Sequence, residues 1–247
     1  IATTIDGLIP CFADFDRNLY GLQFYAESND PDGSIILSNF AEKICGCSPL
    51  WSMDYFVEQE LQYIQEKIGD GKALMAISGG IDSSACALLM HRAIGNRLKC
   101  VFVDNGLLRT GEADLVLNTF QNELGLELIH IDARDRFMNR LKGITDPKEK
   151  HRAVHNEFIN VLSEVNEQAG AEYLVEGTIY SDLLMGSPTD DAYARKYQSG
   201  KLIEPIRMLF KDEVRRLGEI LGLPMPLINR QPFPGPALAV RCIGEVT

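Results

Sequence analysis

The fold of this chain is decided by seven residues, Ser78-Gly79-Gly80-Ile81-Asp82-Ser83-Ser84. An apolar run, residues 73–77, precedes them, and a run of helix formers, residues 85–90, follows them. A strand that stops at two glycines and continues as a helix makes a tight turn. Its backbone N–H groups and the helix dipole together bind anions of phosphate size. The sequence therefore predicts a phosphate-binding turn; the alternative is an ordinary strand-to-helix turn with small residues for close packing.

The side chains of this loop add to its chemistry. Ser78, Ser83 and Ser84 offer hydroxyl donors, and the carboxylate of Asp82 could hold a metal ion. The loop lacks the lysine of a Walker A motif. The charge that neutralises a bound phosphate must therefore come from a metal ion or from another part of the chain.

A regular alternation of apolar runs and helical patterns surrounds the loop. The expected strands cover residues 73–77, 99–103, 127–131 and 172–175, and the expected helices cover residues 53–68, 83–94, 112–124 and 148–168. This pattern predicts an α/β fold, a doubly wound parallel sheet with helices on both faces. Ligands in such sheets bind at the carboxyl ends of the strands. Before residue 48 we expect short strands over residues 8–12, 19–24 and 34–37.

Composition limits the classes of function. The 247 residues include 35 acidic and 24 basic side chains, a net charge of −11, which argues against a nucleic-acid or anionic-membrane surface. The six cysteines are scattered and fit a reduced, cytoplasmic setting. We expect no signal peptide, and the sequence contains no apolar run long enough to span a bilayer. Because the first residue is not methionine, we expect a fragment or a processed chain.

The loop resembles the pyrophosphate loop of the ATP pyrophosphatases, which cleave ATP between the α and β phosphates. Four more segments resemble the GMP synthetase family within that group, in the right order. They are Val-Phe-Val-Asp-Asn-Gly-Leu-Leu-Arg (101–109), Glu-Gly-Thr-Ile-Tyr (176–180), Leu-Phe-Lys-Asp-Glu-Val-Arg (209–215) and Pro-Phe-Pro-Gly-Pro (232–236). The resemblance covers the chain from about residue 1 to residue 247, and the order of its motifs makes it specific.

The resemblance implies an ATP-dependent ligase that forms a C–N bond. In such enzymes O2 of XMP attacks the α-phosphate of ATP, pyrophosphate leaves, and ammonia then displaces AMP to give GMP. The loop is expected to hold the β and γ phosphates, with Mg²⁺ at Asp82. Val103, Asp104 and Gly177 are expected on the nucleotide side of the site. The alternative for Asp104 is a carboxylate that caps its own loop.

Three later residues complete the expected site. Asp182 matches an aspartate of the family's mobile lid, and its alternative is a helix N-cap. Lys211 could supply the cation that the loop lacks, and its alternative is a solvated residue of a first helical turn. Arg241 and the turn over residues 232–236 are expected on the XMP side. Asp82, Asp182 and Lys211 are the candidate catalytic residues.

The first part of the chain departs from the family pattern. Residues 1–47 resemble the end of a class I glutamine amidotransferase domain, in which Gln-Phe-His-Pro-Glu supplies the catalytic His and Glu. Here that segment reads Gln-Phe-Tyr-Ala-Glu (23–27), and Tyr25 stands in the place of the His. A phenol is a poor general base at neutral pH. We therefore expect a remnant without glutaminase activity, so that free ammonia or ammonia from a partner serves the reaction.

The second part departs too. Residues 48–247 are expected to form the ATP pyrophosphatase domain, with Met185 where the family's lid carries a glutamate. The chain stops where the family's C-terminal dimerisation domain would begin. Three hypotheses remain open: a GMP synthetase core, a related ATP pyrophosphatase with another acceptor, or a nucleotide-binding descendant without catalysis.

Overall fold

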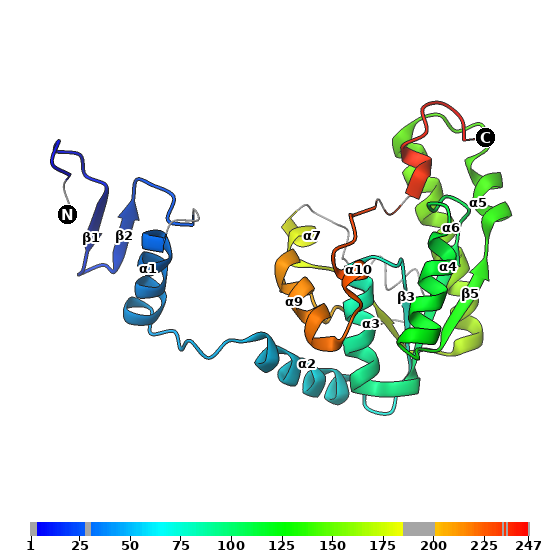
Figure 1. Ribbon diagram of the computed structural model, residues 1–247, viewed down its shortest axis with the longest axis horizontal. Coiled ribbons are helices and arrows are strands. Elements are labelled where there is room, and N and C mark those ends of the chain that lie inside the picture. Colours follow the sequence, from blue (N-terminus) through cyan, green and yellow to red (C-terminus); the bar gives the residue numbers. More distant parts are fainter. Residues whose placement is uncertain (1–3, 28–30, 185–200, 234, 236, 247) are drawn as a thin grey trace. The chain divides into compact units, whose positions relative to one another are not determined.

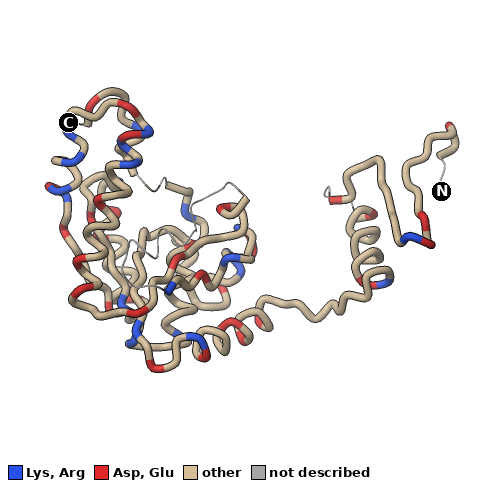
Figure 2. Tube along the Cα trace, turned by 180° about the vertical axis from the view of Figure 1, so that it is seen from behind, with Lys and Arg blue, Asp and Glu red and all other residues tan. Residues whose placement is uncertain are grey.

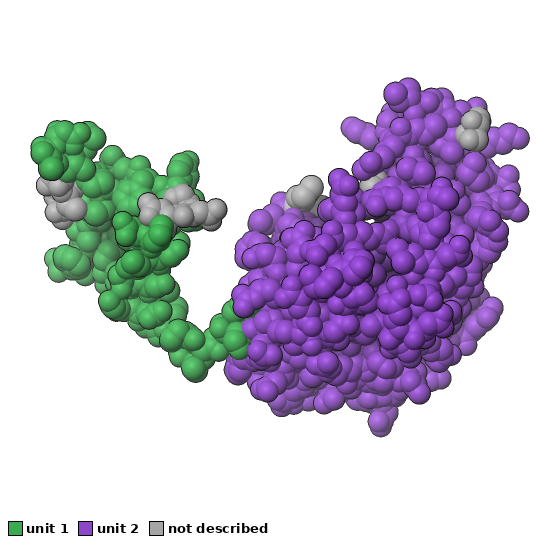
Figure 3. Space-filling view, in the orientation of Figure 1, with its two compact units in different colours: residues 1–52 green, residues 53–247 purple. Residues whose placement is uncertain are grey.

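The computed structural model describes residues 4–27, 31–184, 201–233, 235 and 237–246. The chain forms two compact units, residues 1–52 and 53–247, which are coloured separately in Figure 3. The identity of residues 1–47 as an amidotransferase remnant stays a prediction. Each unit is described by itself below.

The N-terminal unit contains a hairpin and a helical segment. Strand β1 (Cys11–Asp14) pairs antiparallel with β2 (Leu19–Leu22). Helix α1 (Pro31–Asn39) continues as a π-helical turn, η1 (Phe40–Ile44). The rings of Tyr20 and Phe40 pack edge to face with centroids 5.7 Å apart, so the helical segment lies against the hairpin.

The strand predicted over residues 34–37 is wrong, because these residues lie inside α1. Their branched and apolar side chains are typical of a strand, but Pro31 at the first position of the segment has the φ angle that begins a helix. Gly33 is buried, and a Cβ there would collide with the backbone carbonyl of Ala26. A glycine thus allows the first turn of the helix to lie directly on the preceding chain.

The second unit is built on five parallel strands (Figure 1). They are β3 (Ala73–Ala76), β4 (Leu98–Asp104), β5 (Leu128–Asp132), β6 (Tyr173–Val175) and β7 (Lys201–Ile203). Their order in the sheet is β5-β4-β3-β6-β7, and every pair is parallel. The chain moves outward from β3 on one side and then returns to its other side, which places the topological switch point between β3 and β6. The four predicted strands are confirmed, and β7 was not predicted.

Helices lie before, between and after the strands along the chain. They are α2 (Met53–Ile68), α3 (Ile81–Ile94), α4 (Glu112–Leu117), α5 (Arg134–Leu141), α6 (Pro147–Ala169), α7 (Tyr180–Leu184), α9 (Lys211–Leu221) and α10 (Met225–Ile228). Shorter turns of other helical types are η2 (Gly95–Arg97), η3 (Asn118–Glu123) and η4 (Ala237–Val240). The single helix predicted over residues 112–124 is α4 followed by the π-helical η3.

The core explains why helices cover both faces of the sheet. Successive strand side chains point to opposite faces, so Leu74 and Val101 join one cluster while Met75 and Cys100 join the other. The first cluster is completed by α5 and α6, and the second by α2, α3, α4 and α9. All four of these strand side chains are fully buried. The predicted doubly wound α/β fold is confirmed.

The structure also shows how the charged residues are distributed and the state of the cysteines. Acidic and basic residues are interspersed along the trace in Figure 2. All six cysteines are free thiols. Among the helices that the structure describes, none has the length and apolar character needed to cross a bilayer.

Candidate active site

The loop over residues 78–84 lies at the carboxyl end of β3, beside the switch point of the sheet. A pocket opens there, lined by this loop, by the ends of β3 and β4, and by parts of four later segments. Those later contributors are Glu112 of α4, Phe158 of α6, Lys211 of α9, and several residues between 230 and 237. The sheet therefore gathers segments from across the second unit around the predicted anion loop.

The loop has the backbone that an anion site requires. Gly79 has a φ of +73°, and a Cβ there would lie 2.5 Å from Cγ2 of Val116, so only glycine fits. Gly80 is the N-cap of α3 and has no side chain with which to cap it. The N–H groups of the first turn of a helix lack intrahelical partners. At α3 they are therefore left available for an anion.

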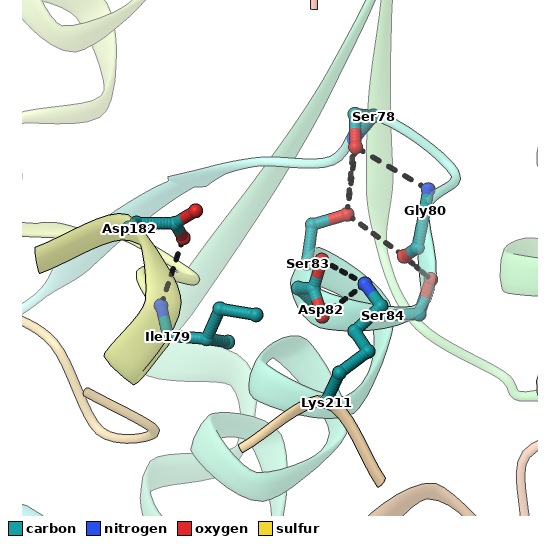
Figure 4. A network of polar contacts seen from close by, with 8 residues as sticks. All are labelled: Ser78, Gly80, Asp82, Ser83, Ser84, Ile179, Asp182 and Lys211. Carbon is teal, nitrogen blue, oxygen red and sulfur yellow. Dashed lines mark hydrogen bonds and ion pairs between the residues drawn. The ribbon is translucent and has the colours of Figure 1, made fainter. Parts of the chain in front are cut away.

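The serines of the loop bind its own backbone. The hydroxyls of Ser83 and Ser84 both donate to the carbonyl oxygen of Gly80, at 3.1 and 2.6 Å. Oγ of Ser78 lies 3.0 Å from Oγ of Ser83 and accepts the N–H of Gly80 at 3.3 Å (Figure 4). The loop is thus held in shape by bonds among the residues predicted to bind phosphate.

Asp82 and Lys211 form an ion pair at the first turn of α3. Nζ of Lys211 lies 2.7 and 2.6 Å from the two carboxylate oxygens, and both side chains are about one-third exposed (Figure 4). Lys211 begins α9, 129 residues further along the chain. The sequence predicted both residues for the site. The structure adds that the cation missing from the loop lies in contact with the loop's own carboxylate.

Arg230 reaches the loop and Glu112 pairs with Arg230, and the sequence analysis missed both as site residues. Nη1 of Arg230 donates to the carbonyl oxygen of Gly79 at 2.7 Å, and its guanidinium forms an ion pair with buried Glu112. Burial, and then the nearby charge of Arg109, lower the pKa of Arg230. Arg230 comes 151 residues after Gly79, so no local pattern joins them. The available signal was a basic residue two positions before the segment Pro-Phe-Pro-Gly-Pro.

Of the three residues predicted on the nucleotide side, Val103 lines the pocket, whereas Asp104 and Gly177 shape the backbone beside it. The carboxylate of Asp104 accepts the N–H of Gly106 at 2.9 Å, which is the loop-capping alternative. A Cβ on Gly177 would lie 3.2 Å from backbone atoms of Asp82, so this glycine allows the chain after β6 to pack on the start of α3.

Asp182 and Arg241 do not line the pocket. Oδ2 of Asp182 accepts the N–H of Ile179 at 3.0 Å and so closes the first turn of α7 (Figure 4). Arg241 is exposed, and its guanidinium carbon lies 5.8 Å from the ring centroid of Phe233, a pocket residue. Met185 and the rest of the predicted lid lie outside the described residues.

A partly buried carboxyl group lies just beyond β6. Burial, and to a smaller degree the charge of Glu204, raise the pKa of Glu176 to about 7. Oε2 of Glu204 forms an ion pair with Arg207 at 3.0 Å, and its Oε1 is buried without a hydrogen-bond partner among the described residues. Glu176 is therefore sensitive to pH near neutrality.

The donor set suits a metal ion that arrives with a nucleotide. Within the described part of the chain, no three His, Cys, Asp or Glu side chains form a metal-binding group. Mg²⁺ in nucleotide sites needs only one or two protein carboxylates, because phosphate and water oxygens complete its shell. Asp82 is the carboxylate that the loop supplies at the pocket.

Comparison with known proteins places these features in context. A family model described as NAD synthase matches residues 53–235. The GMP synthase [glutamine-hydrolyzing] of Listeria innocua is 47% identical over 257 residues, covering 100% of this chain and 50% of the relative. The enzyme of the same name from Lactiplantibacillus plantarum is 45% identical over 258 residues, with the same coverage. The chain spans about half the length of these relatives.

Solved structures agree on the fold. An NH3-dependent NAD synthetase from Campylobacter jejuni superposes with a TM-score of 0.59 at 20% identity, covering 74% of this chain and 80% of that one. An NMN synthetase from Francisella tularensis gives 0.61 at 16% identity, covering 76% and 78%. At these identities the likeness shows the fold alone.

Proposed function

Because this chain belongs to the GMP synthase [glutamine-hydrolyzing] family, we propose that it carries out the ATP-dependent amination of XMP to GMP. The observation that supports this most directly is the Asp82–Lys211 ion pair, placed on the anion-binding first turn of α3 inside a pocket. The proposed reaction needs an anion site, a cation and a carboxylate at one place, and the first turn of α3, Lys211 and Asp82 lie together here.

The proposed reaction has two steps. O2 of XMP attacks the α-phosphate of ATP, which forms an adenylated XMP and releases pyrophosphate. Ammonia then attacks C2 of the purine ring, the C–O bond breaks, and AMP leaves with its electron pair. The first step concentrates negative charge on the leaving pyrophosphate, so donors and cations at the loop lower its barrier.

The loop residues provide those donors. We assign the pyrophosphate to the free N–H groups of the first turn of α3. The hydroxyls of Ser78, Ser83 and Ser84 would exchange their present bonds within the loop for bonds to the phosphate oxygens. Lys211, now paired with Asp82, supplies a positive charge within reach of the same turn. Mg²⁺ held with the nucleotide by Asp82 would withdraw charge from the phosphate oxygens.

With the pyrophosphate assigned to the loop, the adenosine and the XMP are assigned to the parts of the pocket on either side. Val103 lies against the adenosine, and Asp104 shapes the neighbouring loop through Gly106. Arg241 and Phe233 lie on the XMP side, and Asp182 orders the segment that leads into the predicted lid. The reaction uses free ammonia or ammonia from a partner, because Tyr25 occupies the place of the amidotransferase His and this chain does not hydrolyse glutamine. The proposed location is the cytoplasm.

A direct assay tests the proposal. The protein is incubated with ATP, Mg²⁺ and XMP, with either ammonium or glutamine, and GMP and pyrophosphate are followed. We expect GMP with ammonium and none with glutamine. Pyrophosphate release only with another acceptor, or ATP binding without turnover, would contradict the proposal. Asp82→Asn should abolish pyrophosphate release while the circular dichroism spectrum stays native.

A further inference from the structure

The peptide between Gly79 and Gly80 is held on both of its sides. Its carbonyl oxygen accepts Nη1 of Arg230 at 2.7 Å, and its N–H donates to Oγ of Ser78 at 3.3 Å. In a trans peptide the C=O and N–H groups point in opposite directions. The bond to Arg230 therefore also determines where the N–H of Gly80 points.

This peptide needs such a restraint more than most. Gly79 has a φ of +73°, and two adjacent glycines allow the peptide plane to rotate at little steric cost. Rotation would turn a carbonyl oxygen toward the bound phosphates in place of an N–H group. Both Ser78 and Gly80 line the pocket, whereas Gly79 does not.

Arg230 is itself held by Glu112. Glu112 is 5% exposed, and the side chain of Arg230 is 14% exposed, so each charge is removed from water and must be paired. Oε2 of Glu112 also accepts the N–H of Arg109 at 2.8 Å. Glu112 thus fixes Arg230 to the start of α4, and Arg230 fixes the loop.

We propose that Glu112 and Arg230 are positioning residues that hold the Gly79–Gly80 peptide so that the N–H of Gly80, which here donates to Oγ of the pocket residue Ser78, is turned toward the pocket and can bind the phosphates of ATP. This inference rests on the proposed function of the loop as a pyrophosphate site. Neither side chain is assigned to the reacting atoms. Their effect is on the affinity of the loop for its anion, and the chemical step depends on them only through the placement of ATP.

The test compares two changes at this pair. The double variant Glu112→Gln/Arg230→Met removes both charges together, so no unpaired charge remains buried. Arg230→Lys keeps the charge, but a single ammonium cannot bond Gly79 and Glu112 with the geometry of a guanidinium fork. Arg140→Met is the matched control, because Arg140 also pairs with a buried glutamate, Glu157, away from the pocket.

Binding of ATP and of inorganic pyrophosphate is measured by calorimetry, together with KM and kcat. We expect the double variant to bind both at least about tenfold more weakly, Arg230→Lys to lose several-fold, and Arg140→Met to match the native protein. KM for ATP should rise more than kcat falls. Native affinity in a folded double variant, or in Arg230→Lys, would overturn the inference.

A second measurement does not depend on nucleotide. Amide hydrogen exchange at Gly80 in the free protein should be faster in Arg230→Lys than in the native protein, because the peptide is no longer fixed. Unchanged exchange contradicts the positioning role even if no GMP is formed. If exchange at Gly80 is faster in Arg230→Lys but the native protein binds no nucleotide, the proposed function is refuted and the role of Arg230 in holding the peptide stands.

Discussion

The substitution Glu176→Gln tests how the carboxyl end of β6 responds to pH. Burial first, and the charge of Glu204 second, raise the pKa of Glu176 from 4.5 to about 7 in the folded protein. The unfolded chain releases this proton near pH 4.5. The native state therefore holds a proton that the unfolded state lacks throughout the window from about pH 4.5 to 7.

The sign and the size follow from linkage. A raised folded-state pKa gives stability that is fully present below pH 4.5 and is lost as the pH rises through about 7. At 1.36 kcal/mol per pKa unit, the shift corresponds to roughly 3 kcal/mol of unfolding free energy. Glutamine keeps the shape of the protonated acid but cannot ionise. We therefore expect the variant to match the native protein near pH 4.5 and to exceed it by roughly 3 kcal/mol at pH 8.

The assay is urea denaturation at pH 4.5, 6 and 8, followed by far-UV circular dichroism and extrapolated linearly to water. Tryptophan fluorescence would not report on this unit, because the single tryptophan, Trp51, lies in the N-terminal unit. Glu172→Gln is the matched control, since Glu172 is exposed and paired with Lys201 at 3.7 Å. Burial also raises the pKa of Glu60 to about 7, so the variant should retain part of the native slope.

A gain in stability that is equal at all three pH values would refute this reasoning. It would mean that the amide packs better than the carboxyl group, whatever its charge. No gain at pH 8 would show that Glu176 is ionised in the folded protein at neutral pH. Only a difference that grows between pH 4.5 and 7 agrees with the burial of a protonated acid.

Three further changes test the loop and one helix. Lys211→Met should lower pyrophosphate release from ATP by about 100-fold, as expected for loss of one preorganised charge, while the exposed Lys148→Met leaves the rate unchanged. Gly79→Ala should abolish ATP binding in calorimetry, because the φ of Gly79 is positive and Val116 occupies the position of a Cβ. Gly80→Ala should bind ATP more tightly than Gly79→Ala, because its Cβ would meet only the hydroxyl of Ser78 at 3.3 Å. Asp146→Ala should lower the unfolding free energy in urea by about 1 kcal/mol, since this carboxylate caps the two N–H groups that begin α6; an unchanged midpoint would contradict that role.

The outline of the second unit could be predicted from the sequence because its signals are local. Each buried parallel strand is a short apolar run, and a helix follows each strand along the chain. The helix over residues 53–68 agrees with its predicted bounds for the same reason. In residues 34–37 of α1 two local preferences compete, because the branched side chains favour a strand whereas Pro31 favours the start of a helix, and Gly33 allows that helix to lie against Ala26. Sequence periodicity carries no information about such a contact.

Resemblance and loop chemistry together led to Asp82 and Lys211 as candidate site residues but did not predict the bond between them. Their atoms meet only because α9 packs beside α3, far along the chain. Glu112 and Arg230 were missed for a related reason, since each is an ordinary charged residue until burial forces the two to pair.

The sequence by itself determined that a strand, two glycines and a helix form a tight turn at this place, because a short segment sets its own backbone geometry. Only the tertiary structure decided which charges surround that site. Coulombic pairing depends on distance through space and on the water removed by packing, and neither is written in the order of residues. The loop was therefore predictable, whereas the residues that hold it in place were not.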